Sequence, residues 1–268
     1  MPVTQAMTSI IQTELKRIEQ EQQVRILYAC ESGSRAWGFP SQDSDYDVRF
    51  IYVHPPEWYL SIFNRRDVIE YPINEQLDIN GWDLRKALNL FRKSNPPLLE
   101  WLHSPILYAE NGSLAERIRN VSPNHFSPRS CMYHYLHMAK GNFRGYLQGD
   151  TVKIKKYFYV LRPILACLWI DEKGTMPPVS FDELIDEMLP PGQLRSDIDQ
   201  LLTRKKAGEE LHLEQQIPSI QNFLTDMIDI LEQQVVHMPT SEQLQDELLD
   251  QLFRETLQYA YPNEVSLL

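Results

Sequence analysis

The residues most able to do chemistry lie close together in the stretch 31-ESGSRAWGFPSQDSDYDVRF-50. Gly33-Ser34 is followed, after ten residues, by the pair Asp45 and Asp47. Side chains alternate between the two faces of an extended strand, so both carboxylates of an Asp-X-Asp pair point the same way. Two adjacent carboxylates repel each other unless they share a cation. The pair therefore predicts a site for a hard divalent cation such as Mg²⁺, which prefers oxygen ligands.

A third carboxylate is expected on a neighbouring strand, because one Asp-X-Asp pair does not complete a site for two ions about 3.5–4 Å apart. Asp78 is the preferred candidate, because Leu77 and Ile79 would face one layer and Asp78 the other. Asp83 is the alternative, although its place before a helical run is more typical of an N-cap. The predicted metal ligands and catalytic carboxylates are Asp45, Asp47 and Asp78.

The Gly-Ser turn before the pair suits the binding of a triphosphate. Gly33 allows the backbone a tight turn, so N–H groups and the Ser34 hydroxyl can approach phosphate oxygens closely. Arg35 follows directly and could neutralise part of the phosphate charge. These three residues are the predicted triphosphate contacts.

The wider pattern predicts the elements that would hold these residues at one site. β-branched and aromatic runs predict strands at 24–30, 45–53, 68–71 and 77–82. Apolar periodicity predicts helices over 5–22, from Asp83 onward, over 98–103, over 130–148 and over 153–171, with an extended segment at 104–108. The predicted fold class is α+β: a small mixed β-sheet core with flanking helices in residues 1–122, then a helical C-terminal domain in residues 123–268.

The composition is that of a globular protein. The chain has 268 residues, 43% of them hydrophobic, and no run approaches the roughly 18 apolar residues of a membrane helix. Three widely separated cysteines and an amphipathic N-terminal helix indicate a cytoplasmic protein with reduced thiols, and no membrane partner is expected. From Asp171 onward 20 acidic residues stand against 6 basic ones, whereas the first 170 residues carry a net charge of +3. The acidic part would repel a long polyanion.

The order of these residues and strands resembles that of a known superfamily, although the acidic C-terminal portion gives no matching motif. The chain has a strand, then Gly-Ser, then Asp-X-Asp on a second strand, and then a lone Asp on another strand. This order is similar to the order in DNA polymerase beta-type nucleotidyltransferases. Within roughly residues 25–170, five stretches resemble the predicted nucleotidyltransferase family named for an RNA repair pathway. These stretches are GSRAWGF, DSDYDVRFIY, LDINGWDLRKAL, KSNPPLLEWLHSPI and KKYFYVLRPILA. The resemblance implies two Mg²⁺ ions, with Mn²⁺ as a substitute, and transfer of a nucleoside monophosphate from an NTP. It implies RNA-end modification only weakly.

The helix predicted over 153–171 offers a second group of candidate residues. Lys155, Tyr159 and Arg162 recur at helical spacing on one face. We expect Lys156, Tyr159 and Arg162 to bind the phosphates and base of the nucleotide from the second domain. The alternative is a solvated basic face with a packing tyrosine.

Other sites fit parts of the sequence less well. An EF-hand beginning at Asp43 would need Gly at its sixth position and Glu at its twelfth, where this chain has Val48 and His54. Surface acidity does not explain Asp47 within an apolar strand. Trp37 is left open between base stacking and the core. No Cys or Glu at the spacing of a zinc site accompanies the three histidines nearest one another, which are His125, His134 and His137.

The sequence therefore predicts a metal-dependent nucleotidyltransferase that transfers a nucleoside monophosphate from an NTP to a hydroxyl acceptor and releases pyrophosphate. The acceptor could be a short RNA end, a protein side chain or a small molecule. Two other classes stay open: a nucleotide-binding regulator or scaffold, which would tolerate loss of Asp78, and a nucleotide-sugar-dependent transferase, which would release a nucleoside diphosphate. The acidic C-terminal helices are expected to be solvated or to form a homodimer contact.

Overall fold

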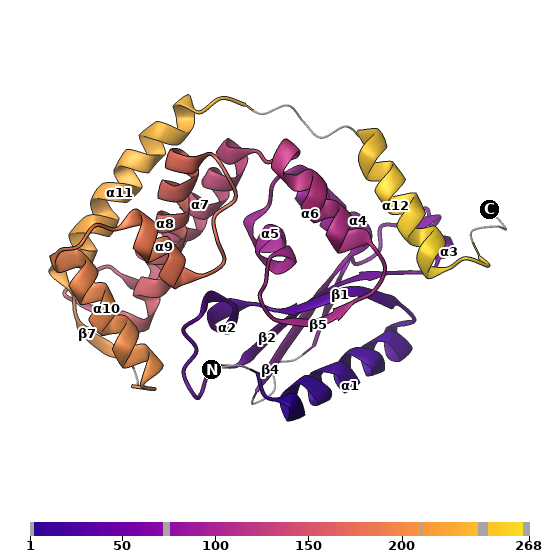
Figure 1. Cartoon of the computed structure of the whole chain (residues 1–268), viewed down its shortest axis with the longest axis horizontal. Helices are drawn as coiled ribbons and strands as arrows, with labels where there is room; N and C mark the ends of the chain where they lie inside the picture. Colours follow the sequence, from indigo (N-terminus) through magenta and orange to yellow (C-terminus); the bar gives the residue numbers. More distant parts are fainter. Residues whose placement is uncertain (1–2, 72–75, 210, 241–245, 265–268) are drawn as a thin grey trace.

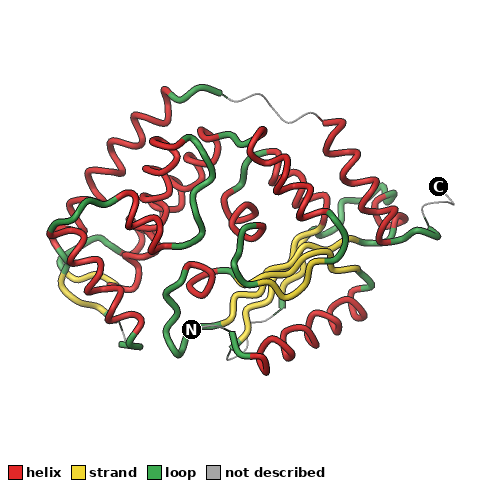
Figure 2. The backbone as a smooth tube through the Cα atoms, in the orientation of Figure 1, coloured by secondary structure: helices red, strands yellow, loops and turns green. Residues whose placement is uncertain are grey.

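The computed structural model describes residues 3–71, 76–209, 211–240 and 246–264. Its centre is one five-stranded sheet with the order β3-β4-β2-β1-β5, in which β2 and β4 run parallel and the other neighbours antiparallel (Figures 1 and 2). The strands are β1 (Arg25–Glu31), β2 (Tyr46–Val53), β3 (Val68–Glu70), β4 (Leu77–Asp83) and β5 (Leu107–Glu110). The predicted α+β class with a mixed sheet is confirmed.

Helix α1 (Gln5–Gln22) covers one face of the sheet (Figure 1). Its Ile11, Leu15 and Ile18 are buried against the apolar side chains of that face. Thr4 starts the helix, because its side chain accepts a hydrogen bond from the backbone N–H of Met7 at 3.2 Å. The predicted helix over 5–22 is confirmed.

The opposite face of the sheet carries the helices that follow β4. They are α4 (Leu84–Arg92), α5 (Pro96–Leu102) and α6 (Leu114–His125), and their apolar residues share a core with β1 and β2. Two short helices lie in the connections before and after β2, α2 (Gly33–Trp37) and α3 (Pro56–Tyr59). The stretch 31–39, predicted as a turn, therefore contains one and a half helical turns, ended by Gly38 in the left-handed conformation.

The second half of the chain has its own helical core. It contains α7 (Pro128–Tyr146), α8 (Phe158–Lys173), α9 (Phe181–Met188), α10 (Gln193–Lys206) and α11 (Pro218–His237), with the ribbon β6 (Thr151–Lys153) and β7 (Leu213–Gln215) at its edge. The helix predicted over 153–171 starts late, at Phe158. Residues before it pair with β7 and then form a 3₁₀ turn, Ile154–Tyr157.

Helix α12 (Asp246–Ala260) packs on the first half although it follows the second half in the chain (Figure 1). Leu252 is buried in the core beneath α4, and the Tyr261 hydroxyl donates to the Val53 carbonyl at 3.2 Å. The domain boundary predicted after residue 122 stays a prediction, and α12 lies beyond it in the chain but packs on the first half. No helix among the described residues is long and apolar enough to span a membrane.

Candidate active site

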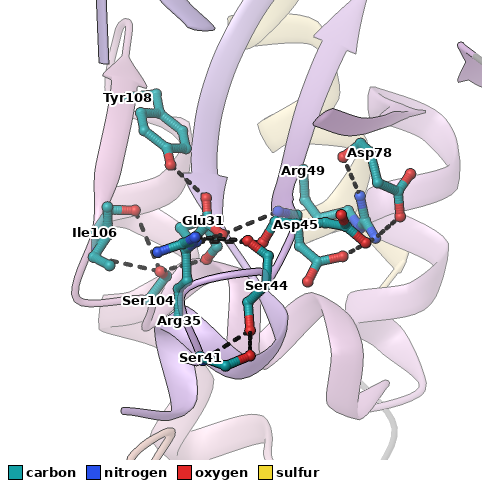
Figure 3. A network of polar contacts seen from close by, with 11 residues as sticks. Glu31, Arg35, Ser41, Ser44, Asp45, Arg49, Asp78, Ser104, Ile106 and Tyr108 are labelled. Carbon is teal, nitrogen blue, oxygen red and sulfur yellow. Dashed lines mark hydrogen bonds and ion pairs between the residues drawn. The ribbon is translucent and has the colours of Figure 1, made fainter. Parts of the chain in front are cut away.

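Asp47 and Asp78 face each other across two hydrogen-bonded strands. They are register partners in the parallel pair β2–β4. The guanidinium of Arg49 lies between them, 3.1 Å from Asp47 Oδ1 and 2.7 Å from Asp78 Oδ2 (Figure 3). Arg49 also donates to the Asp78 carbonyl at 2.8 Å and to the Val48 carbonyl at 3.1 Å. The two carboxylates thus already share a cation, and that cation is the side chain of Arg49 on β2, the strand that also carries Asp47.

Asp45 lies just before β2, at the rim of the site. Its side chain is exposed, whereas Asp47 is partly buried. Both line one pocket, as the Asp-X-Asp spacing predicts. Burial raises the pKa of Asp47; Arg49 lowers it, and the nearby carboxylates of Asp78 and Asp45 raise it further. A group that gathers negative charge in this way is suited to binding cations.

Gly33 is required where the chain passes the carboxylate of Asp47. Its φ is +59°, and a Cβ built there would lie 2.0 Å from Asp47 Oδ2. The neighbouring Ser32 N–H donates to the Asp47 carbonyl at 2.8 Å, which ties the turn to β2. Only glycine satisfies both the backbone conformation and the close approach.

Arg35 supports the loop before Asp45 and does not line the pocket. It is buried, and it donates to the carbonyls of Ser44 at 2.6 Å and Asp45 at 3.3 Å (Figure 3). Its guanidinium also lies 3.8 Å from the centre of the Tyr46 ring. These contacts make Arg35 a positioning residue, and they leave Ser34 as the side chain of the turn that reaches the pocket.

Glu31 is the buried carboxyl behind Asp47. It is fully buried, and it accepts hydrogen bonds from the Asp47 backbone N–H at 3.0 Å and from the Tyr108 hydroxyl. Burial raises the pKa of Glu31 to about 7, although both hydrogen bonds act in the opposite direction. Sequence reasoning did not single out Glu31, because its role depends on the pairing of β1 with β2.

The pocket lies between the two halves of the chain and has a volume of about 130 Å³. The first half contributes Ser34, Asp45 and Asp47, and the second half contributes Lys155, Tyr159 and Lys205. Carboxylates on one wall thus face two ammonium groups and a phenol ring on the other. This division of charge suits a ligand that carries both phosphates and a metal ion, and the pocket is smaller than the roughly 300–1,000 Å³ of most small-molecule sites.

Of the predicted residues from the second half, Tyr159 lines the pocket, but Lys156 and Arg162 do not. Lys156 Nζ lies 4.5 Å from the ring centres of both Tyr146 and Tyr159. Lys155 lines the pocket where Lys156 was expected, because residues 154–157 form a 3₁₀ turn and not the first turn of α8. Lys156 is therefore placed behind Tyr159, where it supports the ring.

Arg162 is part of the core and not of the pocket. It is 2% exposed and pairs with Glu100 at 2.6 Å, while its guanidinium lies 4.7 Å from the centre of the Trp37 ring. Trp37 Nε1 and the Tyr135 hydroxyl also donate to Glu100, at 3.2 and 2.7 Å. The structure thus contradicts the expected contact of Arg162 with phosphate, because its guanidinium is used inside the protein. Trp37 also lines the pocket, but its N–H donates to Glu100 and the Arg162 guanidinium lies over one face of its ring.

Lys205 is a pocket residue that sequence reasoning missed. It lies on α10, is 6% exposed and donates from Nζ to Ser41 Oγ at 2.8 Å, across the two halves. Burial and, to a smaller extent, the charge of Lys155 lower its pKa to about 8. The run Arg204-Lys205-Lys206 in an otherwise acidic half was the available signal.

Asp83, the alternative third carboxylate, caps α4 as predicted. Its Oδ1 accepts from the Arg85 N–H at 2.8 Å, and its Oδ2 accepts from the Tyr59 hydroxyl at 2.7 Å. Asp78 is therefore the carboxylate beside Asp47. Among the residues that the structure describes, no three or more His, Cys, Asp or Glu side chains are arranged to hold a metal ion, and this includes the three histidines.

The α+β fold with a mixed sheet is the fold predicted for a nucleotidyltransferase. The model of the RNA repair pathway DNA polymerase beta family matches residues 7–255, and the chain belongs to this family. A curated relative, the uncharacterized protein YcgL of Bacillus subtilis (strain 168), is 58% identical over 216 residues, which are 81% of this chain and 83% of YcgL. A solved structure, that of a nucleotidyltransferase-like protein from Exiguobacterium sibiricum 255-15, aligns with 84% of this chain and 78% of its own chain at 9% identity and a TM-score of 0.35.

Proposed function

We propose that the protein is a metal-dependent nucleotidyltransferase that moves a nucleoside monophosphate from an NTP to a hydroxyl acceptor. The observation that carries the proposal is the in-register pair Asp47 and Asp78 beside the Gly33 turn. Membership of a DNA polymerase beta family supports a transferase of this class. The acceptor we propose is an RNA end, in line with the family's description.

The residues present fit Mg²⁺ in their chemistry, because carboxylate oxygens are its usual protein ligands. Asp47 and Asp78 already converge on one cation, the Arg49 guanidinium, and Asp45 lies at the same pocket as Asp47. As they stand, the three carboxylates do not surround one metal position, and they would hold the ion only after Arg49 withdraws and the side chains converge. Bound there, Mg²⁺ would neutralise phosphate charge and make the α-phosphorus easier to attack.

The protein's own groups then bind and orient the two reactants. Ser34 donates to the triphosphate, and the ammonium groups of Lys155 and Lys205 offset its charge. Tyr159 offers its ring to the base or sugar. The acceptor oxygen attacks the α-phosphorus, its proton passes to a carboxylate such as Asp78, and the bond to the β-phosphate oxygen breaks to release pyrophosphate. Positioning and charge neutralisation supply the rate enhancement.

A second candidate function is a nucleotide-binding module without transfer. The position of Arg49 favours it, because a guanidinium held by both carboxylates competes with a metal ion. In such a module the NTP would bind through Ser34, Lys155 and Lys205, and Asp78 would be dispensable.

Pyrophosphate release separates the two functions. The native protein, Asp45→Asn and Asp78→Asn would be incubated with Mg²⁺, each NTP in turn and a single-stranded RNA with a free 3′ hydroxyl. Asp226→Asn, an exposed residue on α11, is the matched control. A transferase releases pyrophosphate in the native protein and the control but not in the two site variants. A binding module releases none, and Asp78→Asn binds NTP as the native protein does.

A further inference from the structure

A second pocket lies at the other end of the sheet from Asp45 and Asp47. Its walls are the segment after β2, residues 54–67, and helix α4, and its volume is about 500 Å³. Strand β4 carries Asp78 near its start and ends at Asp83, which lines this second pocket. Asp78 and Asp83 are five residue steps apart along the strand, a distance of about 17 Å at ~3.3 Å per residue. This pocket is therefore distinct from the proposed active site.

The second pocket has an excess of positive charge. Four basic side chains line it, against the carboxylates of Asp67 and Asp83; they are Arg65, Arg85, Lys86 and Lys93. Asp67 pairs with Lys86 at 3.0 Å, and Asp83 is fully buried beneath the Tyr59 hydroxyl. Within the described part of the chain, the other three cations, Arg65, Arg85 and Lys93, have no carboxylate at ion-pair distance. Such a surplus is notable in a chain of net charge −11, because it is available to an anionic ligand.

Aromatic rings lie among these cations. Trp58 stacks on His54 with ring centres 4.1 Å apart, and the Arg65 guanidinium lies 5.7 Å from the Trp58 ring centre on the same wall. Phe63, which lines the pocket, is 74% exposed. A ring this exposed packs little against the folded chain and offers surface to a planar ligand.

We propose that this second pocket binds a single-stranded segment of the RNA acceptor. Proteins that hold single strands combine cations, which contact the phosphates, with aromatic rings, on which the bases stack. Here Lys93, Arg85 and Arg65 would contact phosphates, and Phe63 would stack on a base. The inference rests on the proposed function, since it names the acceptor of that reaction. An acidic peptide would use the cations but would gain little from the exposed ring.

Binding of a fluorescent single-stranded RNA of about 12 nucleotides, followed by anisotropy without metal or NTP, tests the proposal. Lys93→Glu is compared with Lys16→Glu, an exposed lysine on α1. Phe63→Ala is compared with Ile62→Ala, an exposed neighbour that does not line the pocket. Thermal melting confirms that all four variants fold.

We expect Lys93→Glu to weaken RNA binding about tenfold and Phe63→Ala about fivefold, with both controls within about twofold of the native protein. Three phosphate contacts predict a slope of about −2 for the logarithm of the binding constant against the logarithm of salt concentration, and Lys93→Glu should reduce its magnitude by about 0.7. RNA that does not bind, or variants that match their controls, would overturn the proposal. So would a mononucleotide or an acidic peptide that competes as well as the RNA.

The same samples separate this inference from the proposed function. Asp78→Asn lies outside the second pocket and should bind the RNA as the native protein does, while it releases no pyrophosphate. If no variant or native sample releases pyrophosphate but the pocket variants still lose RNA binding, the transferase proposal fails and the RNA site stands. If transfer occurs and the pocket variants bind RNA as tightly as the native protein does, only the proposal of the RNA site fails.

Discussion

At the scale of single residues, the site depends on how one arginine and one glycine meet the aspartates. The types and spacing of Asp45 and Asp47 were visible in the sequence, because strand alternation puts them on one face, and Asp78 was expected to point away from Leu77 and Ile79 on its own strand. The position of Arg49 was not visible, because it depends on the register in which β2 meets β4. The close approach of Gly33 to Asp47 likewise required the fold.

Replacing Arg49 by Met should raise the affinity of the site for divalent ions. The variant removes the cation that Asp47 and Asp78 share, so an Mn²⁺ or Mg²⁺ ion no longer has to displace it. A charge-assisted contact worth about 1.4 kcal/mol corresponds to a tenfold change in affinity. Isothermal titration measures it, with Arg17→Met on α1 as the control. An affinity equal to that of the native protein would show that Arg49 and the ion do not compete.

Gly33→Ala should damage the site more than Gly38→Ala. Both glycines have positive φ, +59° and +95°, so both variants pay a similar backbone cost of about 1 kcal/mol. Only at Gly33 does the new methyl meet Asp47, whereas nothing lies within 4 Å at Gly38. NTP binding and urea denaturation of both variants test this. Equal losses would mean that the contact with Asp47 is unimportant.

Asp83→Asn should remove part of the pH dependence of stability. Burial raises the pKa of Asp83 from 3.8 to about 6. Between these values the folded chain holds a proton that the unfolded chain has lost, so stability falls as pH rises from about 4 to about 6 and then levels off. Asparagine keeps the cap without titrating, so its stability relative to the native protein should rise over that window. Urea denaturation from pH 4 to 7 measures this, and parallel curves would contradict it.

At the scale of elements, the strands and most helices follow from local pattern, and the exceptions have distant causes. The helix predicted over 153–171 begins late because β6 pairs with β7, about sixty residues further along the chain. Arg162 was expected on a basic face, yet its partner Glu100 comes from α5 in the other half. Periodicity reports which residues share a face but not which element covers that face.

The Glu100 network should hold α2, α5, α7 and α8 together. Glu100→Gln would leave the charge of Arg162 buried with a weaker partner, a loss of about 3–5 kcal/mol of folding stability. The exposed Glu116→Gln on α6 is the control. The double variant Glu100→Leu with Arg162→Met should recover part of the loss, because no unpaired charge remains but the Tyr135 hydroxyl and the Trp37 N–H lose their acceptor. Chemical denaturation measures all three, and a double variant no better than Glu100→Gln would refute this explanation.

At the scale of the whole molecule, the pocket is formed where the two halves meet. The first half supplies the carboxylates, and the second supplies Lys155, Tyr159 and Lys205. Lys205 comes from the acidic half of the chain, where the short basic run Arg204-Lys205-Lys206 was its only mark in the sequence. The return of α12 to the first half was also not predicted, because its amphipathic pattern fits either core.

The fate of the two ends of the triphosphate tests the central claim most directly. Native protein, Asp78→Asn and the control Asp226→Asn would be given Mg²⁺, RNA with a free 3′ hydroxyl, and an NTP labelled at either the α- or the γ-phosphate. We predict that the native protein and the control attach the α-label to RNA and release the γ-label as pyrophosphate, while Asp78→Asn does neither. An α-label that stays on free nucleotide in every sample, although the native protein binds the NTP and the RNA, would contradict the account.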